Sequence, residues 1–88
     1  MERIEAELLT DGGNNAVVRL PGRRFPGVVV QGDSLSNLRQ AVTEVREACA
    51  RGDAAEALEN ADFLLANLDS ILERYTDALN GHGIKRPF

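Results

Sequence analysis

Apolar and polar side chains alternate over residues 3–9, with Ile4 and Leu8 on one face of the segment and glutamates on the other. A period of two is typical of a strand that is buried on one side. Glutamate and alanine also favour helices, so a short helix is the alternative. The Asp-Gly and Asn-Asn pairs within residues 10–15 favour a strand that turns into an antiparallel partner.

Two further segments have the composition of strands. Residues 16–20 are rich in β-branched side chains, and residues 28–31 begin with three consecutive valines. The loop between them, residues 21–27, contains two prolines and two glycines and sustains neither a strand nor a helix. We therefore expect three short strands, at about residues 3–9, 16–20 and 28–31, joined as an antiparallel meander.

The following segment repeats its apolar positions with the spacing of a helix. In residues 35–50 these positions lie three and four residues apart, which is typical of an amphipathic helix. They are Leu35, Leu38, Val42, Val45 and Cys49. Asp33 or Ser34 has the side chain of an N-cap residue, and Gly52 suits the left-handed conformation that often ends a helix.

A second helix is predicted over residues 54–80, where Asp53 and Glu56 resemble a capping box. Its heptad seam continues for three repeats and consists of Leu58, Ala61, Leu65, Leu68, Leu72, Tyr75 and Leu79. A second row at a spacing of seven lies beside the seam and consists of Ala57, Leu64, Ile71 and Ala78. This helix is about ten residues longer than the first, so the first helix alone cannot cover both rows.

These elements predict an α+β fold in a single domain, residues 1–88. The expected order is βββαα: a three-stranded antiparallel meander followed by an α-helical hairpin, with the first helix covering the sheet. Residues 81–88 form a short tail, in which Ile84 and Phe88 either fold back on the core or a partner or stay free.

The two apolar rows of the longer helix predict self-association. Together they are wider than the surface that one neighbouring helix covers, and an exposed apolar patch of this kind marks an interface. We expect a homodimer that buries Leu64, Leu65, Leu68, Ile71, Leu72 and Tyr75. The alternative is that the surplus apolar residues pack on the sheet of the same chain.

Composition narrows the functional classes. The 88 residues carry a formal net charge of −4, which argues against a nucleic-acid partner. A single cysteine excludes an internal disulfide framework. One cysteine and one histidine together provide too few ligands for a conventional structural zinc site. No apolar run is long enough for a membrane-spanning helix. We expect a cytoplasmic protein that is not an enzyme, with no catalytic residues, metal or cofactor and no membrane partner. Nine arginines against one lysine indicate a GC-rich bacterial genome.

Few side chains are candidates for chemistry. Cys49 lies on an apolar stripe, where we expect a small buried hydrophobe rather than a reactive thiol. Asp69, Glu73 and Asp77 repeat every four residues and form an acidic ridge, which we expect to be a solvated face.

Arginines gather around the loop after the second predicted strand. Arg19, Arg23 and Arg24 could form a basic patch that binds an anion or a partner. The alternative is that they pair with nearby carboxylates, Glu5, Glu7 and Asp33.

Residues 17–45 contain Val-Arg-Leu-Pro at 18–21, Phe-Pro-Gly-Val at 25–28 and Gln-Gly-Asp-Ser-Leu at 31–35, running into a helix. This series resembles the antitoxin domain of the HicB-like family, and the matching positions are Pro26, Gly27, Gly32, Asp33, Ser34 and Leu35. The resemblance implies a sheet with a helix on one face and a protein that binds and inactivates a small ribonuclease toxin. The whole chain also resembles small uncharacterised bacterial proteins grouped as domains of unknown function.

The expected function is that of a non-enzymatic, self-associating protein–protein interaction module, antitoxin-like or regulatory. Its partners are then a second copy of the chain and a small protein such as a toxin. An immunity protein that neutralises a basic toxin through the acidic ridge is the alternative. A ligand- or anion-binding module that uses Arg19, Arg23 and Arg24 ranks third.

Overall fold

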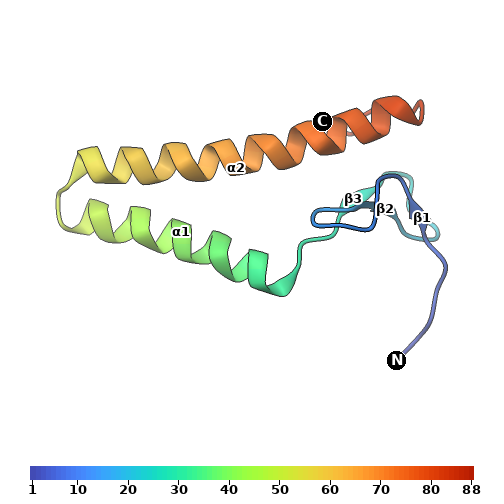
Figure 1. Ribbon diagram of the computed structural model, residues 1–88, viewed down its shortest axis with the longest axis horizontal. Helices are drawn as coiled ribbons and strands as arrows, with labels where there is room; N and C mark the ends of the chain where they lie inside the picture. Colours follow the sequence, from blue (N-terminus) through green and yellow to red (C-terminus); the bar gives the residue numbers. More distant parts are fainter. The chain divides into compact units, whose positions relative to one another are not determined.

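The computed structural model describes all 88 residues and contains three strands followed by two helices (Figure 1). In chain order these are β1 (Glu7–Leu8), β2 (Val17–Arg19), β3 (Gly27–Val28), α1 (Gly32–Ala50) and α2 (Ala54–Gly81). The predicted α+β fold with the order βββαα is therefore confirmed. By internal contacts the chain divides into a sheet unit, residues 1–30 and 71–88, and a hairpin unit, residues 31–70.

The sheet is an antiparallel meander in the order β1-β2-β3. Glu7 is paired with Arg19 across β1 and β2, and Val17 is paired with Val28 across β2 and β3. Each strand is only two or three residues long, shorter than the segment expected for it. β2 ends two residues before Pro21, which has no amide hydrogen to donate to a neighbouring strand.

The core of the sheet unit forms between β2 and the end of α2. Val17, Tyr75 and Leu79 are buried together, and Leu9, Val28, Ala78 and Ile84 pack against them. The expectation that the first helix covers the sheet is wrong for this core, since its helical residues come from α2. α2 has 28 residues against 19 in α1, and its last turns carry Tyr75 and Leu79 onto the sheet. Tyr75 and Leu79 therefore follow the alternative prediction, in which the surplus apolar residues of the longer helix pack on the sheet of the same chain.

Arg74 of α2 forms hydrogen bonds to the turn between β1 and β2. Its Nη2 donates to Oδ1 of Asp11 at 3.0 Å, and its Nε donates to the carbonyl oxygen of Asn15 at 3.3 Å. Asn15 has a left-handed backbone with φ of 58°, which asparagine tolerates better than most residues. The turn is therefore held at both ends by one guanidinium group.

The ends of α1 differ in how well they match the prediction. The helix begins at Gly32 with Gln31 as its N-cap, which makes no side-chain capping bond, so the expectation of Asp33 or Ser34 as N-cap is wrong. The Asp33 carboxylate instead accepts from the amide of Ser34 at 2.8 Å. After the helix, Gly52 has the expected left-handed conformation, with φ of 74°.

The turn into α2 and the end of α2 follow from local chemistry. Oδ1 of Asp53 accepts a hydrogen bond from the amide of Glu56 at 3.1 Å, which is the N-cap half of the predicted capping box. At the other end, Gly83 has φ of 67°, and the amide of Ile84 donates to the carbonyl oxygen of Leu79 at 2.9 Å. This turn directs Ile84 onto the core, and the ring of Phe88 stacks on Tyr75 with centroids 6.2 Å apart.

Candidate functional site

The hairpin unit leaves most of its large apolar side chains in solvent. Ala48 and Ala57, beside the turn, are its only buried residues. Leu35, Leu58 and Leu65 are 59%, 63% and 56% exposed. Burial of a leucine side chain stabilises a protein by about 1.5–3 kcal/mol relative to its exposure, so this unit forgoes most of its hydrophobic stabilisation.

Apart from Phe63, which lies on the opposite side of α2, the large exposed apolar residues form one row on each helix of the unit. On α1 the row is Leu35, Val42 and Cys49, and on α2 it is Leu58, Leu65 and the adjacent Leu68. Every row residue except Leu68 comes one position after a buried or half-buried residue, and one position turns the chain by about 100° around the helix axis. These preceding residues face the other helix and are Ser34, Ala41, Ala48, Ala57 and Leu64. Because the two helices are antiparallel, both rotations bring the rows to the same side of the hairpin. We call this surface of six residues the hairpin face.

Within α1 and α2, a charged residue stands four positions after four of the six row residues. On α1, Arg39 follows Leu35 and Arg46 follows Val42. On α2, aspartates stand in the same relation: Asp62 follows Leu58, and Asp69 follows Leu65. All four charged side chains are exposed, and none takes part in an ion pair within the chain. The hairpin face therefore has a basic border along α1 and an acidic border along α2.

The structure divides the residues expected at a self-association surface. Leu65, Leu68 and Leu72 are exposed, although Leu72 belongs to the sheet unit. Leu64 and Ile71 are half-buried. Tyr75 is 5% exposed and lies in the core of its own chain, so its place in the expected surface is wrong. Leu35, Val42 and Leu58 were not expected at that surface, and they are exposed as well.

The three loop arginines do not form one basic patch. Arg19 makes a two-pronged ion pair with Glu7, its partner across the strands, with Nε and Nη2 donating at 3.0 and 2.8 Å. These hydrogen bonds lower the pKa of Glu7 from its ordinary value of 4.5 and raise the pKa of Arg19. The guanidinium carbon of Arg24 lies 5.2 Å from the centre of the Phe25 ring, a cation–π distance. Arg23 has no ion-pair partner.

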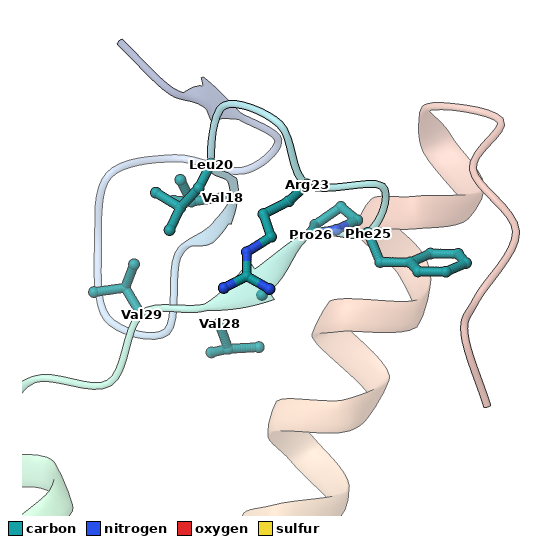
Figure 2. A pocket seen from close by; sticks show the side chains of 8 residues that line it. Val18, Leu20, Arg23, Phe25, Pro26, Val28 and Val29 are labelled. Atoms are coloured by element: carbon teal, nitrogen blue, oxygen red, sulfur yellow. The ribbon is translucent and has the colours of Figure 1, made fainter. Parts of the chain in front are cut away.

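Arg23 reaches over an apolar hollow on the sheet unit (Figure 2). The hollow has a volume of about 350 Å³ and is lined by Val18, Leu20, Arg23, Pro26, Gly27 and Val29 among others. Arg23 is the only charged residue in that lining. The sequence interpretation missed the hollow, although the alternation along β2 separates Val18 from the buried Val17 and signals a second apolar face.

The model of a family of unknown function, DUF6959, matches residues 1–88. The chain belongs to this family. The predicted resemblance to a family of unknown function is therefore confirmed. Nothing in the comparisons supports the resemblance to the HicB-like antitoxin domain. No curated protein and no solved structure matches the sequence of this DUF6959 member.

The remaining candidate residues of this DUF6959 chain are dispersed. Cys49 is exposed, so the expectation of a buried thiol is wrong. Asp69, Glu73 and Asp77 are exposed and unpaired, and no group of three or more His, Cys, Asp or Glu is placed to hold a metal ion. Nε2 of the single histidine, His82, lies 3.1 Å from the carbonyl oxygen of Leu9. Neither helix is both long and apolar enough to span a membrane.

Proposed function

We propose that this protein is a non-enzymatic protein–protein interaction module that pairs with a second copy of itself through the hairpin face. One observation carries the proposal: the hairpin unit buries two alanines and exposes six apolar residues on a single side. An apolar surface of this kind on a two-helix hairpin is half of a four-helix core. Two hairpins that meet face to face would cover both halves.

The spacing of the rows favours a helical partner. Leu35, Val42 and Cys49 repeat every seven residues, as do Leu58 and Leu65. A repeat of seven keeps an apolar seam facing a neighbouring helix along its whole length. A second copy of the hairpin presents two such helices with the same repeat.

The charged borders select the second copy and its orientation. In a symmetric pair whose two-fold axis runs along the helices, α1 of one copy lies over α2 of the other. Arg39 and Arg46 then approach Asp62 and Asp69 of the second copy. The other face-to-face arrangement, with the axis across the helices, places arginines beside arginines and aspartates beside aspartates, which is repulsive. Charge complementarity therefore supports a pair in which each α1 packs on the α2 of the other copy.

The single cysteine provides a test without any substitution. Cys49 belongs to the hairpin face and is exposed in the isolated chain, so pairing should shield its thiol from a small disulfide reagent. We expect the rate constant of the reaction to fall as protein concentration rises. The Leu65→Asp variant, which places a charge in the face, should react at the fast rate at every concentration. A wild-type rate constant equal to that of Leu65→Asp at every concentration would contradict the proposal.

A further inference from the structure

We propose that the hollow beneath Arg23 is a binding site for a small amphipathic carboxylate, a molecule with an apolar body and one carboxylate group. The site lies wholly within residues 18–29 of the sheet unit and contains none of the residues of the hairpin face. It is therefore independent of the self-association described above.

The floor of the hollow is open because of one glycine. Val18 is paired with Gly27 across β2 and β3. A Cβ added to Gly27 would meet nothing within 4 Å, so the space above this position is empty. Val18, Leu20 and Val29 surround that space with apolar side chains, and its volume of about 350 Å³ falls within the range of small-molecule sites. An apolar body of modest size matches this lining.

The charge over the hollow selects the ligand's head group. Arg23 is the one loop arginine that neither a carboxylate nor an aromatic ring of the chain occupies. A guanidinium donates two parallel hydrogen bonds to a carboxylate, which makes that group its best-matched small partner. Figure 2 shows the guanidinium among the apolar side chains of the lining, so one ligand could contact both.

The backbone beside Arg23 is held in place at both ends of the loop. The amide of Arg23 donates to the carbonyl oxygen of Leu20 at 3.1 Å, with Pro21 and Gly22 at the centre of the turn. Gly22 has φ of 75°, as the third position of a type II turn requires. The carbonyl oxygen of Pro26 accepts from the hydroxyl of Tyr75 at 2.8 Å. The site therefore does not need to order its backbone on binding, which would weaken affinity.

The test is a titration of isotope-labelled protein with octanoate, followed by amide NMR shifts, with octanol as the uncharged probe of the same length. We expect octanoate to shift the amides of residues 18–29 with saturation and octanol to bind more weakly. Arg23→Gln should weaken octanoate binding by about fivefold or more. Arg24→Gln, which removes a neighbouring arginine outside the lining, should leave it unchanged. Gly27→Val fills the floor without changing any charge and should abolish binding of both probes.

Four outcomes would overturn the proposal: no saturable shift in residues 18–29, equal affinity for octanol, equal loss in the two arginine variants, or undiminished binding to Gly27→Val. A response confined to the hairpin face would also contradict it, because the octanoate would then be acting as a detergent on that surface. Amide spectra of each variant, recorded before the titration, confirm that the sheet unit is folded.

Discussion

The hydroxyl of Tyr75 donates a 2.8 Å hydrogen bond to the carbonyl oxygen of Pro26, and both residues are buried. The bond joins positions 49 residues apart and ties the loop before β3 to the end of α2. Tyr75→Phe keeps the ring but leaves that carbonyl without its donor. We expect the free energy of unfolding to fall by about 1–3 kcal/mol. Urea denaturation followed by circular dichroism, at one fixed protein concentration, measures the change, and an unaltered midpoint would show that the bond contributes nothing.

Gly52 ends α1 in a conformation that disfavours side chains, with φ of 74°. Gly52→Ala should destabilise the protein by about 1 kcal/mol, because a Cβ is strained at positive φ. The matched control is Gly32→Ala at the other end of α1, where φ is not positive and a Cβ would meet nothing within 4 Å. Thermal unfolding should show a loss for the first variant and none for the second. Equal effects would contradict the assignment of strain to Gly52.

Ion pairing gives Glu7 a pKa below its ordinary value of 4.5, with the hydrogen bond from Arg19 as the largest cause. A carboxyl group whose pKa is lower in the folded than in the unfolded chain contributes stability above its unfolded pKa. That contribution is lost as the pH falls through the lowered, folded value. A ¹³C titration of the Glu7 carboxyl group should give a midpoint below 4.5 in the wild type and a higher one in Arg19→Gln. Arg24→Gln is the control and should leave the Glu7 midpoint in place.

The charged borders of the hairpin face predict that reversing the charges on α1 weakens association, and that reversing the charges on α2 as well restores it. Replacing Arg39 and Arg46 with glutamate places like charges opposite Asp62 and Asp69 in the pair and should weaken association by about tenfold at low salt. Adding Asp62→Arg and Asp69→Arg restores opposite charges and should restore most of the affinity. Analytical ultracentrifugation measures both variants, and higher salt should reduce the difference between them. Failure of the fourfold variant to recover would contradict the proposed orientation of the two copies.

Local patterns predict much of this fold because they depend on neighbouring residues. The period of two and the spacing of three and four identify the strands and helices, and Gly52 and Asp53 mark the turn between the helices. Local patterns do not show which part of the molecule packs against each helix face. Tyr75 and Leu79 continue the same seam as Leu65, yet the first two pack on the sheet and Leu65 stays exposed. Periodicity shows that residues share a face but not what covers it.

The candidate sites depend on register, which the sequence leaves open. Glu7 was one of three carboxylates that could pair with the loop arginines, and it pairs with Arg19 because the two are opposite each other in the sheet. The hollow exists because Gly27 is opposite Val18. A shift of one residue along β3 would place a side chain over that floor. Neither relationship follows from the order of residues alone.

The most direct test of self-association is the mass of the protein in solution. Sedimentation equilibrium should give twice the chain mass of 9.6 kDa for the wild type. Leu65→Asp should give the mass of one chain. Phe63→Asp is the matched control: Phe63 is more exposed, at 71% against 56%, but lies two residues away on the opposite side of α2, so this variant should remain paired. A wild-type protein that sediments as a single 9.6 kDa chain at all concentrations, or two variants that behave alike, would contradict the account.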